Sequence, residues 1–164
     1  MANSYNNYNK VGEIFKEYGS DVNVISALES FIVVYKEKQS YNGPKIPLHI
    51  FSEKKLGILE AATKYLRENH SMKYCEIAKY LNRKDRTIWA SYSTAIKKRK
   101  NKFETSEIKY DVPCNVFSNR KLGPLESLVV YLKDDLHLSI HEISKLINRD
   151  YMTIYLSYTN GKKK

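Results

Sequence analysis

Apolar residues recur at helical spacing in a stretch near the middle of the chain, from Lys73 to Lys98. The apolar positions of the two predicted helices are Ile77, Ala78 and Leu81, followed by Ile88, Tyr92 and Ile96. The second set follows the i, i+4, i+8 spacing of one helical face. A polar run over 82–85 separates the two sets, and an Asn such as Asn82 tolerates the left-handed conformation of a tight turn. The pattern predicts two short helices joined by a turn, the form of a helix-turn-helix.

The same pattern returns near the C-terminus, between Ser139 and Lys164. Shifting the chain by 66 residues aligns 46–98 with 112–164 without a gap. Identical pairs run along the whole alignment and include Pro47/Pro113, Phe51/Phe117, Gly57/Gly123, Glu60/Glu126, Tyr65/Tyr131, Asn82/Asn148, Arg83/Arg149, Ile88/Ile154 and Tyr92/Tyr158. We interpret the chain as a tandem duplication whose functional unit is the repeat.

Each repeat is expected to contain a third helix that precedes the other two. Residues 46–50 predict a short extended segment, because Ile46 precedes a proline. Ser52 is the predicted N-cap of a helix that runs to about Glu68 and faces inward through Leu56, Leu59, Thr63 and Leu66. In the second copy Ser118 takes the place of Ser52, and Leu122, Leu125 and Leu132 face inward. There Ser139 and Glu142 form an intact capping box, whereas the first copy has Lys73 in the place of Ser139.

The remaining segments complete the predicted organisation. Residues 1–45 form an N-terminal helical segment, either a degenerate helix-turn-helix or a helical hairpin that caps the first repeat or dimerises. Repeat 1 spans 46–100, a charged linker spans 101–111, and repeat 2 spans 112–164. The sequence therefore predicts an all-α protein of two tandem trihelical helix-turn-helix domains behind an N-terminal helical segment.

Charge is concentrated where the first motif lies. Of the formal net charge of +10, residues 46–100 carry +8, whereas residues 1–45 carry none and 112–164 carry +3. A basic surface that coincides with a helix-turn-helix is typical of a nucleic-acid-binding module. Cys75 and Cys114 occupy non-equivalent places, and no signal peptide or membrane span is apparent. These features favour a cytoplasmic protein with reduced thiols and no membrane partner.

The residues Glu76-Ile77-Ala78, Leu81-Asn82-Arg83 and Thr87-Ile88 resemble region 4 of bacterial sigma factors. They are also similar to the output domains of many response regulators. Both copies follow this order, with Ser144 in the place of Ala78, and the helix before the motif extends the resemblance over nearly the whole repeat. It implies a DNA-binding fold; polymerase binding is not implied, because the other regions of a sigma factor are absent.

In such a fold the second helix of the motif enters the major groove. If Ile88 faces inward, Arg86, Ala90, Ser93 and Lys97 face outward, with Trp89 at the edge. Arg86 is the predicted base reader, because a guanidinium can grip guanine O6 and N7 together. The residues expected to contact phosphates are Arg83, Lys84, Lys97, Lys98, Arg99 and Lys100, with Lys54 and Lys55 from the preceding helix.

The corresponding helix of the second copy has a different outer face. Its outward positions are Met152, Leu156, Thr159 and Lys163, edged by Tyr151 and Tyr155. Arg149 and Lys163 are further candidates for DNA contact, together with Tyr151 and Tyr155. Exposed apolar groups such as Met152, Tyr155 and Leu156 more often mark a contact with a protein or a second copy. Copy two is therefore expected to be either a weaker DNA reader or a docking surface.

No motif for catalysis, metal binding or a cofactor is visible in the sequence. His137 and His141 are separated by the predicted cap Ser139 and do not share a helix face. The chain is therefore expected to be a double-stranded DNA-binding transcription regulator rather than an enzyme. The alternatives are a protein-interaction adaptor, which could also use the N-terminal helices, and a DNA-binding factor for replication or a mobile element.

Overall fold

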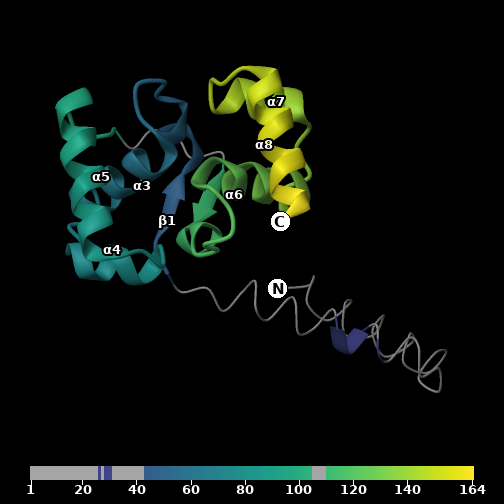
Figure 1. The fold of residues 1–164 in the computed structure, drawn as a ribbon, viewed down its shortest axis with the longest axis horizontal. Helices are drawn as coiled ribbons and strands as arrows, with labels where there is room; N and C mark the ends of the chain where they lie inside the picture. The colour runs from purple at the N-terminus through teal and green to yellow at the C-terminus, as the bar shows by residue number, and fades with distance from the viewer. Residues whose placement is uncertain (1–25, 27, 31–42, 105–109) are drawn as a thin grey trace, which may run out of the picture. The chain divides into compact units, whose positions relative to one another are not determined.

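The structure, a computed structural model, describes residues 26, 28–30, 43–104 and 110–164. The chain divides into two compact units, 1–42 and 43–164. Residues 26 and 28–30 of the first unit are helical, and the rest of the expected N-terminal helices lies outside the described residues. Both predicted repeats lie in the second unit, which is mostly helical (Figure 1). This confirms the all-α class; a small two-stranded sheet is an addition to it.

The two halves of the second unit contain corresponding elements in the same order, and the second half has an additional π-helical segment after its first helix. The first half consists of strand β1 (Lys45–Pro47), the 3-10 helix η1 (Leu48–Ser52), and helices α3 (Ile58–Glu68), α4 (Tyr74–Tyr80) and α5 (Asp85–Lys98). The second half consists of β2 (Asp111–Pro113), the 3-10 helix η2 (Cys114–Phe117), α6 (Pro124–Val130), the π-helical segment η3 (Tyr131–Asp135), α7 (Ile140–Leu146) and α8 (Tyr151–Lys163).

The first helix of each half begins later than the sequence predicted. Ser52 is not the N-cap of α3, because its hydroxyl donates instead to the His49 carbonyl oxygen at 2.7 Å and closes the preceding 3-10 turn. The N-cap is Gly57, whose N–H donates to the Glu60 carboxylate at 3.0 Å. The second half repeats this correction: the Ser118 hydroxyl donates within η2, and α6 begins after Gly123.

The core of each half lies where its three helices meet. Its fully buried side chains in the first half include Ala62, Leu66, Ile77, Leu81 and Ile88, and in the second half Leu128, Leu132, Ile143, Ile147 and Ile154. Leu59, Leu122 and Leu125, expected to face inward, are only partly buried. In α5 the second anchor is Ala95, with no exposed surface, and the predicted anchor Ile96 is 37% exposed. The inward face of α5 is therefore centred on Ile88 and Ala95. The predicted inward residue Tyr92 is half-buried beside them, and its hydroxyl donates to the Glu68 carboxylate of α3 at 3.3 Å.

The turn between the second and third helix has the predicted left-handed residue. Asn82 has φ 49° and Asn148 has φ 51°. The N–H of Arg83 donates to the Ala78 carbonyl oxygen at 2.9 Å, and that of Asn82 donates to Lys79 at 3.2 Å. These two bonds form a Schellman motif, which closes α4 and allows α5 to start three residues later.

The two halves are joined through their strands. Strand β1 pairs with β2 in an antiparallel register that places Ile46 opposite Val112. Two more main-chain bonds extend the ladder, from Leu48 N–H to the Tyr110 oxygen and from Cys114 N–H to the Pro44 oxygen. Beside the strands, the rings of Phe51 and Phe117 pack with centroids 5.7 Å apart. Almost no surface is exposed at four residues of this region, Ile46, Phe51, Val112 and Phe117. These residues form one apolar interface between the halves, called the seam below.

A guanidinium from the second half reaches into the first. Arg149 donates to the carbonyl oxygens of Leu56 at 2.8 Å and Glu53 at 3.3 Å. Its counterpart Arg83 makes no matching contact among the described residues; there the Asn82 amide donates to the Ser118 oxygen at 2.9 Å. The contacts between the halves are therefore symmetric at strands β1 and β2 but asymmetric at the two turns that contain Arg83 and Arg149.

Replacing Asn148 tests the left-handed turn. We expect Asn148→Ala to lower the free energy of unfolding by about 1 kcal/mol, because Asn tolerates the left-handed conformation through its short polar side chain and Ala does not. Asn148→Gly should stay within about 0.5 kcal/mol of the native chain, since glycine adopts this conformation freely. Urea unfolding of the full chain measures both values. Equal losses for the two variants would contradict the turn conformation.

Replacing Arg149 tests the contact between the halves. Arg149→Met should cost about 1.5–3 kcal/mol of stability, because two carbonyl groups lose a charged donor. Arg149→Lys should recover only part of that loss, since both bonds come from one nitrogen of a planar, pre-organised guanidinium, and the flexible, strongly hydrated ammonium of lysine lacks that pre-organisation. Arg83→Met is the matched control and should cost less in the same urea titrations. A loss for Arg83→Met as large as for Arg149→Met would exclude the asymmetry.

Candidate nucleic-acid interface

The outer face of α5 is open and its inner face is anchored. Ile88 and Ala95 have no exposed surface, and they hold the helix against α3 and α4. Arg86 and Lys97 are exposed on the opposite side, and Trp89 is 58% exposed at the edge. Within residues 43–104 and 110–164, Arg86 forms no hydrogen bond or ion pair. Its guanidinium is therefore available to a ligand.

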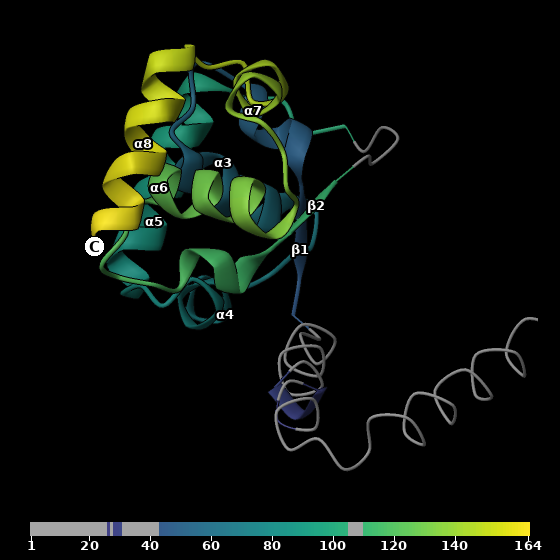
Figure 2. The ribbon, with the colours of Figure 1, turned by 90° about the vertical axis from the view of Figure 1, so that its right-hand side faces the viewer.

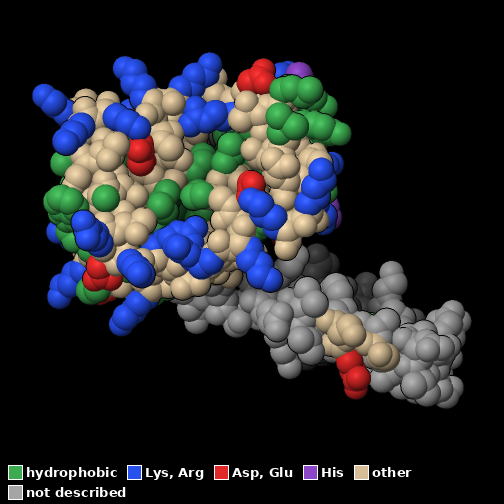
Figure 3. Space-filling view, viewed as in Figure 1, with side chains coloured by type: hydrophobic (Ala, Val, Ile, Leu, Met, Phe, Trp, Pro, Cys, Tyr) green, Lys and Arg blue, Asp and Glu red, His purple; other side chains and the backbone are tan. Residues whose placement is uncertain are grey.

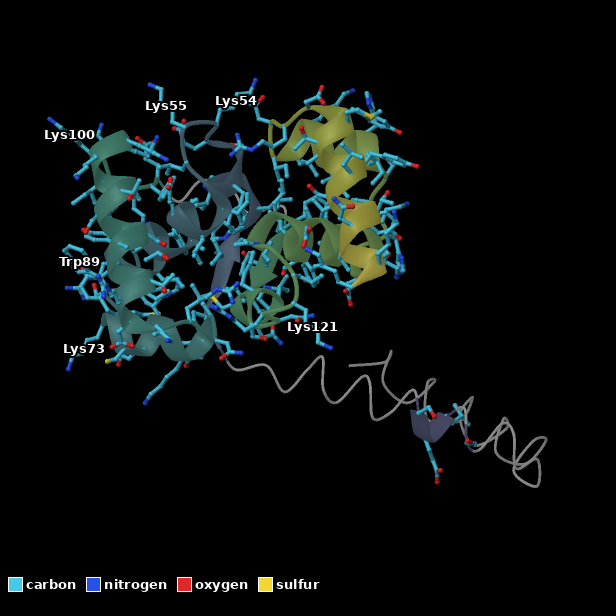
Figure 4. All side chains as sticks on the ribbon, viewed as in Figure 1. Lys54, Lys55, Lys73, Trp89, Lys100 and Lys121 are labelled. Carbon is cyan, nitrogen blue, oxygen red and sulfur yellow. The ribbon has the colours of Figure 1, made fainter. Side chains whose placement is uncertain are left out.

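Further cations without a partner surround this helix. Among the described residues, the exposed lysine ammonium groups that form no hydrogen bond or ion pair include those of Lys54, Lys55, Lys84, Lys97 and Lys100. Lys54 and Lys55 lie in the turn between η1 and α3, and not in the first turn of a helix as expected. Figure 4 shows their side chains projecting from the same end of the unit as Lys100. In the view of Figure 3, Lys and Arg side chains are spread over the part of the surface where α5 lies.

Other predicted phosphate contacts are already used within the protein. Lys98 pairs with Glu60 of α3 at 2.8 Å. Arg99 pairs with Glu53 at 3.1 Å and lies over the Phe103 ring, 4.8 Å from its centroid. These two cations fix the end of α5 against the rest of the repeat. Their charge still adds to the local potential, but a phosphate would compete with a carboxylate for them.

Arg83 and Arg149 lie at the two turns and differ in their surroundings. Burial, with repulsion from Arg120 added, lowers the pKa of the Arg83 guanidinium. Arg83 is half-buried, and Lys84 beside it is exposed. Arg149, a predicted DNA contact, has its guanidinium on carbonyl groups of repeat 1. The structure thus gives Arg149 a role between the halves that the sequence analysis missed.

The outer face of α8 is open too, but it is apolar. Tyr151, Met152, Tyr155 and Leu156 are 46–57% exposed, around the fully buried anchor Ile154. Lys163 is exposed near the end of the helix, and Thr159, like its counterpart Ser93, is half-buried. The third helices of the two repeats, α5 and α8, are therefore anchored in the same way within their own repeats. Their exposed faces differ, because that of α5 is basic and that of α8 is apolar.

Two exposed lysines that were not predicted extend the basic surface. Lys73 is the N-cap of α4, and Lys121 lies before α6. Figure 4 shows both side chains projecting into solvent. Lys121 could have been found from the sequence, because the repeat alignment pairs it with Lys55. Lys73 aligns with Ser139 of the second copy. At this N-cap position a side chain with a capping hydroxyl is expected, so the lysine was not recognised as part of the basic surface.

Three further features of the described part of the chain concern metal ligands, cysteines and membrane spans. No group of three His, Cys, Asp or Glu side chains there is placed to hold a metal ion. Cys75 is exposed and Cys114 is buried. None of the helices in the described ranges combines the length and apolar character needed to span a bilayer.

Comparison with known proteins gives no independent indication of function. No protein-family model, curated protein or solved structure matches this chain.

Proposed function

We propose that this chain is a tandem helix-turn-helix protein that binds double-stranded DNA and regulates transcription. In this interpretation α4 and α5 are the two helices of the first motif, and α5 is its recognition helix. Arg86 reads base edges in the major groove, and the surrounding lysines bind phosphates. The sequence resemblance to sigma factor region 4 favours the same interpretation.

One observation supports the proposal. The outer face of α5 carries exposed cationic side chains, called the cationic ridge here, that form no hydrogen bond or ion pair among the described residues. Arg86, Lys97 and Lys84 are all exposed, while Ile88 beneath them has no exposed surface. A surface of this kind can neutralise several phosphates, and a guanidinium at its leading end can discriminate guanine. Of the acidic side chains in repeat 1, Glu53 and Glu60 are paired with Arg99 and Lys98, and Asp85 is exposed in the first turn of α5.

A second candidate function is a protein-interaction adaptor. The exposed apolar group of Met152, Tyr155 and Leu156 on α8 favours it, because clusters of this kind mark protein contacts. Figure 3 shows a hydrophobic patch at the α7–α8 end of the face, away from the basic side. A regulator that binds DNA through α5 and a protein through α8 would combine both functions.

Arg86→Ala tests the role of α5. We expect the variant to bind its selected duplex about 5- to 150-fold more weakly, the loss of one bidentate base contact. Lys45→Ala removes the same charge from strand β1, on the side of the unit away from α5 (Figure 2). That control should change affinity by less than about twofold in the same titration, because distant charges are screened by salt. Leu156→Glu tests α8: a loss as large as that of Arg86→Ala would refute the asymmetry in which repeat 1 is the main DNA reader and repeat 2 the weaker one.

The salt dependence of binding separates the two candidate functions. A phosphate binder loses affinity with a log–log slope of about −0.9 per phosphate neutralised. Alanine at Lys84, Lys97 and Lys100 together should therefore make the slope less steep by up to about 2.7. Fluorescence anisotropy at several salt concentrations measures the slope. A flat salt response of the native chain would favour the adaptor and exclude the DNA-binding ridge.

A further inference from the structure

The strand contacts between the repeats obey a twofold axis. In the alignment of the repeats Ile46 corresponds to Val112, and these two residues are opposite each other in the strand pair. The neighbouring pairs, Lys45 with Pro113 and Pro47 with Asp111, exchange when the repeats are interchanged. The same is true of the bonds from Leu48 to Tyr110 and from Cys114 to Pro44. A rotation of 180° about an axis that passes between Ile46 and Val112 therefore relates the two strands.

The interior of each repeat follows the same symmetry. Residues with positive φ occur in equivalent pairs, Ser71 with His137 and Asn82 with Asn148. The bond from the Tyr92 hydroxyl to Glu68 has its counterpart between Tyr158 and Asp134. The ion pair of Lys98 with Glu60 is matched by that of Lys164 with Glu126. Because the repeats share one internal structure, the axis at the strands extends to their third helices.

The axis places α5 and α8 on one face in opposite directions. In Figure 1, α5 runs from the α4 end of the unit toward Lys100, and α8 runs the other way, from α7 to the C-terminus. In Figure 2 both helices lie on the side away from strands β1 and β2. The outer residues of α5 and α8 are therefore presented to the same side of the molecule, with reversed polarity.

We propose that the two repeats bind a single duplex as inverted half-sites with different sequences. This inference rests on the proposed DNA binding and adds the arrangement of the target. Duplex DNA has its own local twofold axes, so a protein dyad aligned with one of them places equivalent helices on inverted sequences. A direct repeat would require two reading helices related by translation, which the strand register excludes. The halves differ because Arg86 and Trp89 on α5 correspond to Met152 and Tyr155 on α8.

A variant in which α8 carries the outer residues of α5, called the graft here, tests the inverted arrangement of the half-sites. The substitutions Tyr151→Asp, Met152→Arg, Tyr155→Trp and Leu156→Ala give α8 the outer residues of α5, and all four positions are exposed. Thr153 and Lys163 already match Thr87 and Lys97. The native full chain and the grafted full chain are each used to select ligands from a random duplex library. Circular dichroism verifies that the graft is folded, and a smaller graft of Met152→Arg with Leu156→Ala replaces it if it is not.

The grafted chain should enrich a palindrome of the half-site that α5 reads in the native chain. In direct titration it should prefer the palindrome by about tenfold or more over a duplex with one half reversed, since each lost base contact weakens binding on that order. Enrichment of a direct repeat, of a single half-site, or of both orientations equally would overturn the inverted arrangement while leaving DNA binding intact. A native chain that enriches no sequence and binds no duplex would instead overturn the proposed function, and the arrangement with it.

Discussion

The antiparallel pairing of β1 with β2 is the constraint on which the second unit depends. Three residues on each side form it, and its centre at Ile46 and Val112 has no exposed surface. The buried rings of Phe51 and Phe117 meet beside it. Main-chain pairing in a fixed register determines orientation as well as proximity, because a one-residue slip would turn every side chain to the other face. The opposite directions of α5 and α8 follow from that register.

Features that depend on local sequence were predictable. The repeat, the left-handed Asn in each turn and the buried positions Ile77, Leu81 and Ile88 follow from identity and spacing alone. The start of α3 was not predicted, because Ser52 could cap a helix or close a 3-10 turn, and only the contacts of the folded chain decide between them. An extended segment was predicted over 46–50, but the strand ends at Pro47 and a 3-10 helix follows it. The pairing into a sheet was not predicted, because a strand of three residues has no readable period and its partner lies 66 positions away.

The basic surface was predictable as a region but not residue by residue. From the sequence alone, Lys97, Lys98 and Arg99 are equally good candidates for phosphate contact. In the structure Lys97 has no ion pair among the described residues, whereas Lys98 and Arg99 pair with glutamates from earlier parts of the repeat. Helical geometry explains the difference, since one residue along α5 turns a side chain by about 100°. Arg149 shows the same limit, because its carbonyl acceptors belong to the other repeat. Long-range partners decide which cations remain available.

The dyad between Ile46 and Val112 makes this single polypeptide equivalent to a homodimer whose subunits have been fused. In a true homodimer one gene encodes both subunits, so every mutation appears twice and the two surfaces change together. Here each surface is encoded separately, and a mutation at position 152 leaves position 86 untouched. The seam at the strands has kept its symmetry while the outer residues of α5 and α8 have diverged. Fusion thus gives each half an independent evolutionary path on a shared scaffold.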